Sequence, residues 1–396
     1  MNVLYTVTSY PPAVGGTQAY THQLAVKGLQ AHHQVQVATH WDESRYDWLL
    51  GTTVLAYGEP KKYSFKGVDV YRLGLSPVEK MKILPFVLGY MLFQGAAIAG
   101  ISDVLLEKLK HMGRDWEIIH NVRQGREGLS FASFKLARLL DIPFVFTPVH
   151  HPRWNGWFHR YYRALYQEAD AVIALTRSEK ELLIEFGVSP ERIFVTGNGP
   201  VLAADGDGKA FRDRYNLGLD PVVLFLGTKY KYKGIKSLID ATHRVWRKVP
   251  DARFVFVGPP TRYSSMIFTR DNDNRIIEIG SVDLQEKTDA VAACDILCVP
   301  SSQESFGGVY TEAWAFEKPV IGGDIPAIRD VISDGQDGFL VDQHPDEIAD
   351  KIITLLMCPD LAAQMGFRGR EKVEQQYSWE KLAQSTFQIY EQILSG

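Results

Sequence analysis

Two glutamates, Glu304 and Glu312, lie eight positions apart in the stretch SSQESFGGVYTEAW, on either side of Gly307 and Gly308. Carboxylates accept paired hydrogen bonds from neighbouring sugar hydroxyls. The amides of residues 305–308 would begin a helix, where N–H groups and the helix dipole favour a diphosphate, and glycine lets it approach closely. Eight helical residues rise about 12 Å, which fits a nucleoside diphosphate sugar with Glu304 at the sugar and Glu312 at the ribose. The alternative is a solvated loop residue and a surface helix residue.

The elements that would position these residues alternate along the whole chain. Apolar runs typical of buried strands lie at residues 2–8, 34–39, 118–121, 144–148, 171–175, 222–226, 254–257, 276–278, 296–299, 320–322 and 338–341, and helical patterns at 18–31, 177–186, 235–249 and 309–316. This alternation of strands and helices predicts an α/β fold with parallel sheets covered by helices. A second series of alternating strands and helices begins after a stretch rich in Gly, Asp and Pro at 198–218. We therefore expect two doubly wound units facing a cleft, with ligands at the carboxyl ends of the strands.

Length and composition agree with two domains. The chain has 396 residues, of which 45% are apolar and 23% charged, with a formal net charge of −4. A single core stops growing near roughly 250–300 residues. The weak negative charge provides no basic field for nucleic acid. The cysteines have no metal-ligand spacing with histidine, the N-terminal half has no Asp-x-Asp motif near a strand end, and the chain begins without a leader, which together predict a metal-independent cytoplasmic protein.

A family resemblance extends over nearly the whole chain. The block PSSQESFGGVYTEAWAFEKPVIGGDIPAIRDVISDGQDGFLV resembles the C-terminal signature of retaining glycosyltransferases close to family 4, and YPPAVGGTQAYTHQLA, ADAVIALTRSEKELLIEFGV, VTGNG and YKGIKSLIDA are similar to other parts of that family. The resemblance implies the GT-B fold, α/β with two Rossmann-like domains facing a central cleft. It implies an acceptor-binding domain at 1–198, a donor-binding domain at 199–376 and a last helix at 377–396 that crosses back onto the first domain.

The resemblance also implies a donor site. Lys233 matches the family's lysine and would stabilise the leaving diphosphate. The family's arginine is replaced here by Thr228, which has no charge, and Lys229 is the candidate to replace it. The catalytic candidates are His150, Glu304 and Lys233. The expected donor-binding residues are Gly16, Thr228, Lys229, Lys233, Val282, Glu304, Ser305, Phe306, Gly307, Gly308 and Glu312.

The run FTPVHHPRWNGWFHRYYR at residues 146–163 is the candidate acceptor region. By resemblance, a histidine after this strand lies near the reacting sugar carbon; we choose His150, with His151 as its competitor and a structural histidine as an equal alternative. Sugars stack on aromatic rings, but half of this run also fits ordinary helix core. The acceptor candidates are His151, Arg153, Trp154 and Trp157.

An uncharged apolar segment at residues 83–101 approaches the length of a membrane span. Pro85, Gln94 and glycines interrupt it, so we expect a buried or surface-docking helix. Lysines lie before and around it and favour peripheral contact with the inner leaflet of the membrane. These lysines are Lys61, Lys62, Lys66, Lys80 and Lys82.

We therefore expect a retaining hexosyltransferase that moves a sugar from a UDP- or GDP-linked donor to an acceptor hydroxyl. The acceptor would be a glycan or a lipid-linked molecule of envelope polysaccharide or glycolipid synthesis. The nucleotide sugar is a co-substrate, and no metal or other cofactor is expected. The alternatives are a catalytically silent nucleotide-sugar-binding protein and a nucleotide-sugar epimerase on the same fold.

Overall fold

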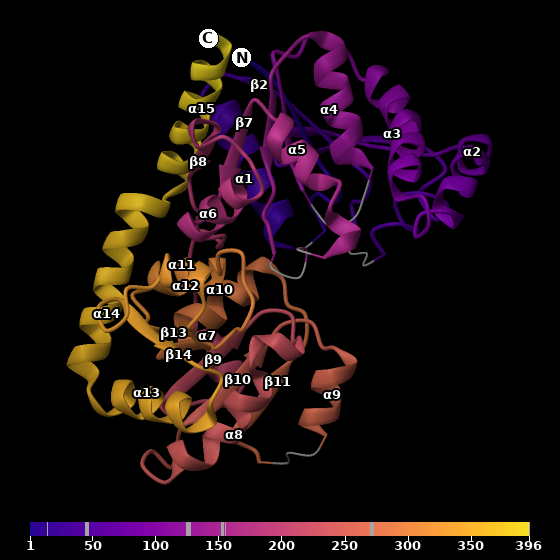
Figure 1. The fold of residues 1–396 in the computed structure, drawn as a ribbon. Coiled ribbons are helices and arrows are strands. Elements are labelled where there is room, and N and C mark those ends of the chain that lie inside the picture. The colour runs from indigo at the N-terminus through magenta and orange to yellow at the C-terminus, as the bar shows by residue number, and fades with distance from the viewer. Residues whose placement is uncertain are drawn as a thin grey trace. The chain divides into compact units, whose positions relative to one another are not determined.

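The computed structural model describes residues 1–13, 15–43, 47–123, 128–151, 154, 156–269 and 273–395. The chain divides into two compact units (Figure 1). Unit 1 comprises Met1–Gly197 together with Trp379–Gly396, and unit 2 comprises Asn198–Ser378.

Unit 1 is built on an eight-stranded sheet. Its strands are β1 (Asn2–Val7), β2 (Gln34–Thr39), β3 (Lys61–Phe65), β4 (Val68–Arg72), β5 (Ile118–Val122), β6 (Phe144–Thr147), β7 (Ala171–Ala174) and β8 (Ile193–Val195). They lie in the order β3-β4-β2-β1-β5-β6-β7-β8, and only β3 runs antiparallel to its neighbour. The inner strands are buried along nearly their whole length, which explains their continuous apolar sequences.

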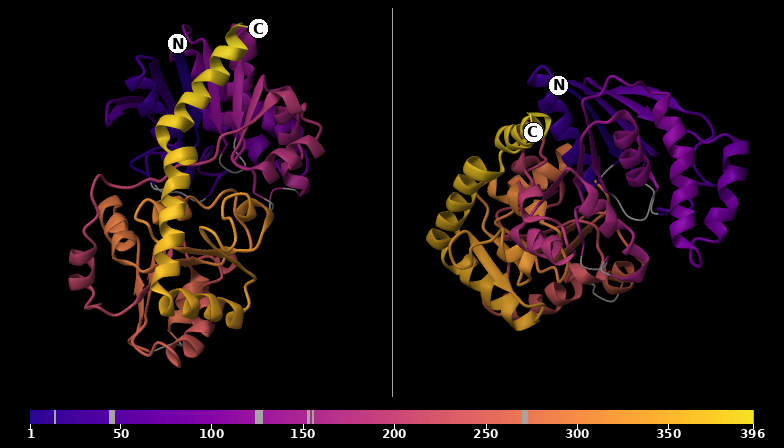
Figure 2. Two further views of the ribbon diagram at one scale, coloured as in Figure 1. Left: turned by 90° about the vertical axis from the view of Figure 1, so that its left-hand side faces the viewer. Right: turned by 45° about the horizontal axis from the view of Figure 1, so that its top comes forward.

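Helices cover this sheet. They are α1 (Gly16–Gln30), α2 (Pro77–Leu88), α3 (Gln94–Lys110), α4 (Leu129–Leu140), α5 (Tyr162–Glu168), α6 (Arg177–Glu185) and α15 (Trp379–Ser395), with short turns η2 (Trp157–His159) and η3 (Pro190–Arg192). The last helix, α15, packs against α1, where Lys27 pairs with Glu380 at 2.5 Å. Its Tyr390 hydroxyl lies 2.5 Å from His120 Nδ1 and donates to Tyr5. The two chain ends therefore belong to the same unit (Figure 2).

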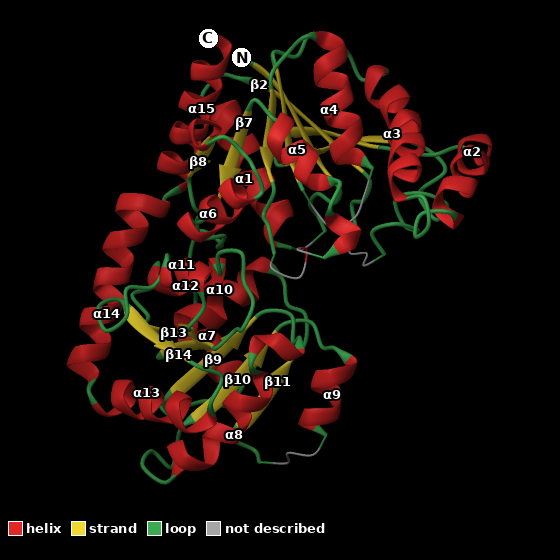
Figure 3. Ribbon diagram, in the orientation of Figure 1, coloured by secondary structure: helices red, strands yellow, loops and turns green. Residues whose placement is uncertain are grey.

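Unit 2 contains a six-stranded parallel sheet (Figure 3). Its strands are β9 (Val222–Leu226), β10 (Arg253–Val257), β11 (Ile276–Ile279), β12 (Ile296–Val299), β13 (Val320–Gly323) and β14 (Gly338–Val341). The order β11-β10-β9-β12-β13-β14 is that of a doubly wound dinucleotide-binding sheet, and it reverses between β9 and β12. Ligands of such sheets bind at this reversal, beyond the carboxyl ends of the strands.

The helices of unit 2 lie before, between and after these parallel strands. They are α7 (Gly208–Arg214), α8 (Ile235–Trp246), α9 (Arg262–Phe268), α10 (Leu284–Ala293), α11 (Gly308–Trp314), α12 (Pro326–Arg329), α13 (Pro345–Met357) and α14 (Pro359–Lys372), with η4 (Lys231–Lys233) and η5 (Val373–Tyr377). Helix α8 has the clearest helical stripe, with Leu238, Ile239 and Val245 buried. The fold is α/β, as expected, with two sheets of parallel strands and one antiparallel edge.

Two local expectations differ from the structure. The β3–β4 hairpin was not predicted, because its edge strand reads KKYSF and lacks an apolar run. The apolar segment at 83–101 is not one helix: α2 ends at Leu88, and α3 begins at Gln94 after a turn that starts at Gly89. Among the described helices, none combines the length and the apolar character needed to cross a bilayer.

Candidate active site

The loops that follow β9 and β12 are joined where the strand order of unit 2 reverses. Ser302 N donates to the Tyr232 carbonyl at 2.8 Å, and Gln343 Nε2 donates to the carbonyls of Tyr232 and Pro300 at 2.7 and 2.6 Å. Gly234 has φ +77°, and a Cβ there would lie 2.5 Å from the Pro300 carbonyl oxygen, so glycine is required. These contacts hold η4 against the loop that carries the first glutamate.

The same contacts bring Lys233 and Glu304 together. Lys233 Nζ forms an ion pair with Glu304 Oε1, and the two side chains are only 15% and 11% exposed. Partly buried charges of this kind are stable as a pair, and loss of either one leaves the other uncompensated. A fixed carboxylate suits sugar hydroxyls, and the adjacent ammonium suits a phosphate oxygen.

The second glutamate also has a lysine partner. Glu312 lies on α11 with its side chain 9% exposed, and Lys287 Nζ on α10 donates to its Oε1 at 2.6 Å. The same ammonium donates to the Val201 carbonyl at 2.5 Å. The pair thus joins α10, α11 and the segment that enters unit 2. Both predicted glutamates therefore stand in ion pairs, and neither is the solvated residue of the alternative interpretation.

The residues between the glutamates have structural roles of their own. Gly307 caps α11 with φ +81°, and a Cβ there would collide with the Tyr310 ring. A Cβ on Gly308 would lie 3.2 Å from Asn198 Nδ2. Ser305 is half-buried, whereas the Phe306 ring is buried and packs edge-to-face on Tyr377 at 5.3 Å. Phe306 can therefore contact a ligand through its backbone but not through its side chain.

Lys229 is directed away from the Lys233–Glu304 pair. Its side chain is fully buried, and its Nζ donates to Glu278 Oε1 at 3.0 Å and to the Ile279 carbonyl at 2.7 Å. Burial lowers the pKa of Lys229, and Glu278 opposes this effect. Thr228 beside it and Val282 before α10 are half-buried. Within the described residues, no group of His, Cys, Asp and Glu side chains has the arrangement of a metal site.

In unit 1, a buried carboxylate holds the loop after β6. Glu179 accepts hydrogen bonds from the backbone amides of His150 and Leu175 at 2.5 and 2.7 Å, and burial raises the pKa of this carboxyl to about 7. Val149 has φ +44°, a strained conformation for a β-branched residue. The His150 imidazole is buried, with Nδ1 3.2 Å from the Tyr166 hydroxyl. Glu179 therefore fixes an unfavourable loop conformation that carries the predicted histidine.

An arginine that the sequence did not single out lies beside this loop. Arg123 follows β5 and is fully buried, with its guanidinium 3.7 Å from the Tyr162 ring centroid and 4.4 Å from that of Trp154. It also hydrogen-bonds to the Tyr166 hydroxyl and lies 2.6 Å from His159 Nδ1. One face of Trp154, an acceptor candidate, is thus occupied by this cation.

The remaining predicted residues lie in different surroundings. His151 is buried with its ring 6.1 Å from Trp154, and Trp157 is exposed. Gly16 begins α1, and a Cβ there would meet no described atom within 4 Å. Arg153 lies outside the described residues. The structure therefore brings together Lys233 and Glu304 in unit 2, and His150, His151 and Trp154 in unit 1.

Sequence reasoning missed four residues that organise these sites: Arg123, Glu179, Lys287 and Gln343. Arg123 carried a usable signal, because a charged residue directly after a buried strand stands at the carboxyl edge of the sheet. Glu179 stands three residues after Thr176, the helix cap of α6. Lys287 contacts Glu312, which is 25 residues away along the chain, and Gln343 contacts Pro300, which is 43 residues away. No local sequence pattern indicates such contacts.

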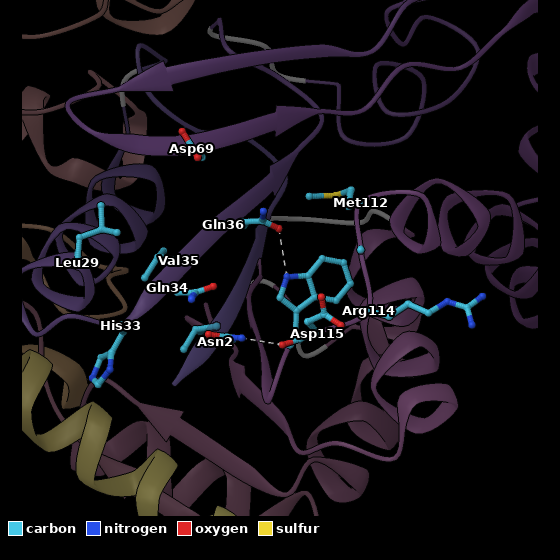
Figure 4. A pocket seen from close by; sticks show the side chains of 13 residues that line it. Asn2, Leu29, His33, Gln34, Val35, Gln36, Asp69, Met112, Arg114 and Asp115 are labelled. Carbon is cyan, nitrogen blue, oxygen red and sulfur yellow. Dashed lines mark hydrogen bonds between the residues drawn. The ribbon is translucent and has the colours of Figure 1, made fainter.

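A pocket of unit 1 lies at the opposite edge of its sheet (Figure 4). Asn2 and Gln34, the paired first residues of β1 and β2, contribute to its lining, as do Gln36 and Asp69. Trp116 Nε1 donates to Gln36 Oε1 at 3.2 Å across it. Because substrates of parallel sheets bind at the carboxyl ends of the strands, this amino-end pocket is not the candidate active site.

Comparison with known protein families agrees with this geometry. The model described as "Glycosyl transferase 4-like domain" matches residues 15–199, and the model "Glycosyl transferases group 1" matches residues 209–372. The chain is a group 1 glycosyltransferase. Together the matches cover most of both units, and members of this family use nucleotide sugars.

Individual relatives of this glycosyltransferase are distant. An uncharacterised glycosyltransferase of Methanocaldococcus jannaschii is 23% identical over 97% of this chain and 96% of its own. The alpha-maltose-1-phosphate synthase of Mycolicibacterium smegmatis is 26% identical over 58% of this chain, and the match spans 65% of that synthase.

Solved structures share the whole fold. Sucrose-phosphate synthase from Thermosynechococcus elongatus gives a TM-score of 0.78 at 20% identity, over 100% of both chains. HepE of Anabaena in complex with UDP-glucose gives 0.75 at 19% identity, also over 100% of both chains. The fold of this glycosyltransferase is therefore GT-B.

Proposed function

We propose that this glycosyltransferase moves a sugar from a nucleoside diphosphate sugar to an acceptor hydroxyl, with retention of the anomeric configuration. The observation that carries the proposal is the Lys233–Glu304 ion pair at the strand-order reversal of unit 2. In this proposal, Glu304 accepts hydrogen bonds from the sugar hydroxyls, and Lys233 donates to the diphosphate. Glu312, held by Lys287, accepts from the ribose hydroxyls.

The proposed chemistry leaves charge on the nucleotide. The bond between the anomeric carbon and the phosphate oxygen breaks while a bond to the acceptor oxygen forms on the same face, and the acceptor proton passes to the leaving phosphate. The Lys233 ammonium stabilises the developing negative charge, as preorganised cations do in group transfer. The proposal assigns this role to Lys233 and the backbone of residues 305–308 and requires no metal ion. Glu304 positions the sugar and does not attack it.

A UDP-linked sugar is the first donor that we propose, with a GDP-linked sugar as the alternative. Support for this choice comes from the HepE neighbour, which was solved with UDP-glucose. We place the donor in unit 2 and the acceptor, a glycan or a lipid-linked molecule, in unit 1. His150 on the loop after β6 remains the proposed histidine of the reaction, and His151 is the alternative.

Two linked measurements test this function. A panel of nucleotide sugars is first screened by thermal shift, since a donor at a hundred times its Kd stabilises the protein by about 2.7 kcal/mol. The best donor is then assayed for nucleotide release, without acceptor and with glycan and lipid-linked acceptors. We expect slow release that acceptor accelerates and that Glu304→Ala strongly lowers. Donor binding without any release, unchanged in Glu304→Ala, would identify a silent nucleotide-sugar-binding protein instead.

A further inference from the structure

Helix α2 is apolar on both of its faces. Ile83 and Val87 are buried on the inner face, and the Phe86 ring lies directly over Gly100 of α3. Figure 1 shows α2 at the outer edge of unit 1, with α3 between it and α4. The opposite face repeats large apolar side chains at helical spacing, all of them exposed: Val78, Met81, Leu84 and Leu88. Large apolar side chains on two faces of a helix are normally buried on both, and those on the outer face of α2 are exposed.

The exposed apolar surface continues beyond α2. Met91, Leu92 and Phe93 in the turn before α3 are all exposed, Leu92 to 80%. The segment around η2 adjoins this turn, because Arg160 Nη1 donates to Gln94 Oε1 at 2.8 Å and the Tyr161 ring lies against Gly95. We call the outer face of α2, the turn 91–93 and the exposed Trp157 and Tyr161 the α2 patch. A continuous apolar surface of this kind marks an interaction site.

The two stretches of chain that carry most of the α2 patch contain cations and no acidic residue. No acidic residue occurs between positions 80 and 102 or between 142 and 167. Cations occur in both stretches: Lys82 is exposed, and the Arg160 guanidinium stacks 3.6 Å from the Trp157 ring centroid. The nearest acid in sequence, Glu79, is paired with Lys108 at 2.7 Å. The surface therefore combines apolar side chains, interfacial aromatics and cations.

Not every lysine predicted to favour docking contributes to this surface. Lys61 pairs with Asp42 at 3.2 Å, and Lys80 donates to the Ala56 carbonyl at 2.5 Å. Lys82 remains on the outer face of α2. The docking surface is thus defined by the two-sided apolar character of α2 rather than by the number of lysines around it.

We propose that the α2 patch docks onto the surface of a bilayer that contains anionic phospholipids. An apolar helix face inserts at the boundary between headgroups and acyl chains, Trp and Tyr rings favour the same depth, and Lys and Arg meet the phosphates. A protein partner would require acidic groups to complement these cations, and a second copy that met the same patch symmetrically would bring cations against cations. The inference is independent of the transfer reaction.

Flotation with lipid vesicles tests this proposal. The full chain is incubated with vesicles of phosphatidylcholine alone and with vesicles that contain 30% phosphatidylglycerol. The double variant Leu88→Glu/Leu92→Glu changes two side chains that are 76% and 80% exposed, so folding is preserved. The matched control Leu219→Glu/Met357→Glu makes the same change in unit 2, where the exposures are 100% and 59%.

We expect the wild-type chain and the control variant to float with the anionic vesicles, and the patch variant to lose at least about tenfold in partitioning. Binding to phosphatidylcholine alone should be weaker. The proposal is overturned if the wild-type chain does not float or if the patch variant floats equally well. It is also overturned if the patch variant changes only the oligomeric state in solution, which would indicate a second copy. Nucleotide release should be equal in all three proteins, which separates this test from that of the transfer reaction.

Discussion

The two candidate sites use charge in different ways. In unit 2, Lys233 and Glu304 form an ion pair that is partly open to solvent, where a ligand can share both groups. In unit 1, Arg123 and Glu179 are buried, one between aromatic rings and the other against the backbone around the strained Val149. In the proposed function, the Lys233–Glu304 pair of unit 2 meets the substrate, whereas Glu179 of unit 1 fixes the shape of a loop through its buried charge.

The largest effect is expected from Lys233→Ala. Removal of the ammonium eliminates the charge that stabilises the leaving diphosphate, so kcat for nucleotide release should fall by about 10²–10³. The matched control is Lys231→Ala, an exposed lysine in the same short turn, which should leave kcat unchanged. If both variants lose activity equally, the diphosphate is stabilised by the combined positive charge of this turn rather than by the Lys233–Glu304 pair.

A smaller loss is expected from Glu179→Gln, and it should be confined to unit 1. An amide can accept from only one of the two backbone N–H groups and presents its own donors to the other, so the loop that carries His150 should shift. We expect kcat to fall by roughly tenfold or more, since small misplacements near a reaction are costly. The Kd of the nucleotide, measured by calorimetry, should not change. A weakened Kd would mean that the division of roles between the units is wrong.

Glu312→Gln should weaken nucleotide binding without affecting the chemical step. Loss of hydrogen bonds from the ribose to a charged acceptor corresponds to about 1.5 kcal/mol, or about tenfold in Kd. A nucleotide without ribose hydroxyls provides the control, because it should bind the wild-type chain and the variant equally. If the variant discriminates between the two nucleotides as strongly as the wild-type chain does, Glu312 does not contact the ribose.

The units should also respond differently to acid. Burial lowers the pKa of His22, His40 and His120 in unit 1 to about 4, 3 and 3, whereas the two histidines of unit 2 are exposed. The unfolded chain binds protons at these positions near pH 6.5, so unit 1 should lose stability as the pH falls from about 6.5 towards 3. Glu179, with its raised pKa, offsets part of this loss between about pH 7 and 4.5.

Hydrogen exchange followed by mass spectrometry resolves the two units in one experiment. As the pH is lowered, amides of β1, β2 and β5 should lose protection before those of β9 and β12, after correction for intrinsic exchange rates. His40→Gln is a useful variant, because it removes one titrating group from unit 1. It should reduce the difference between the pH values at which the two units lose protection. Loss of protection in unit 2 first would contradict this account.

Much of the fold was predictable because its strands are buried on both faces and read as apolar runs between helical patterns. Four of the predicted strands have the expected bounds: Gln34–Thr39, Val222–Leu226, Ile296–Val299 and Gly338–Val341. The break between α2 and α3 was not predicted, because Gly89 was weighed only as an interruption and not as a helix end. Local patterns thus indicated where buried elements occur, but not how an apolar stretch bends at the surface.

The candidate site was predictable where it is contiguous. Glu304, Gly307 and Glu312 lie in one short segment, and the ion pairs of both glutamates agree with their choice. The assignment of Lys229 to the diphosphate followed its position next to Thr228, but the amine turns towards Glu278. The direction of a side chain depends on partners from other strands, and sequence neighbours do not indicate it.

The central claim is that Lys233 and Glu304 act as one unit on the donor sugar. A double-mutant cycle of nucleotide release with the best donor tests it most directly, using Lys233→Ala, Glu304→Ala and the double variant. We predict that each single variant loses most of the activity. The double variant should be as active as the less active of the two single variants. Losses that multiply in the double variant, or a Glu304→Ala variant with wild-type release, would contradict the claim.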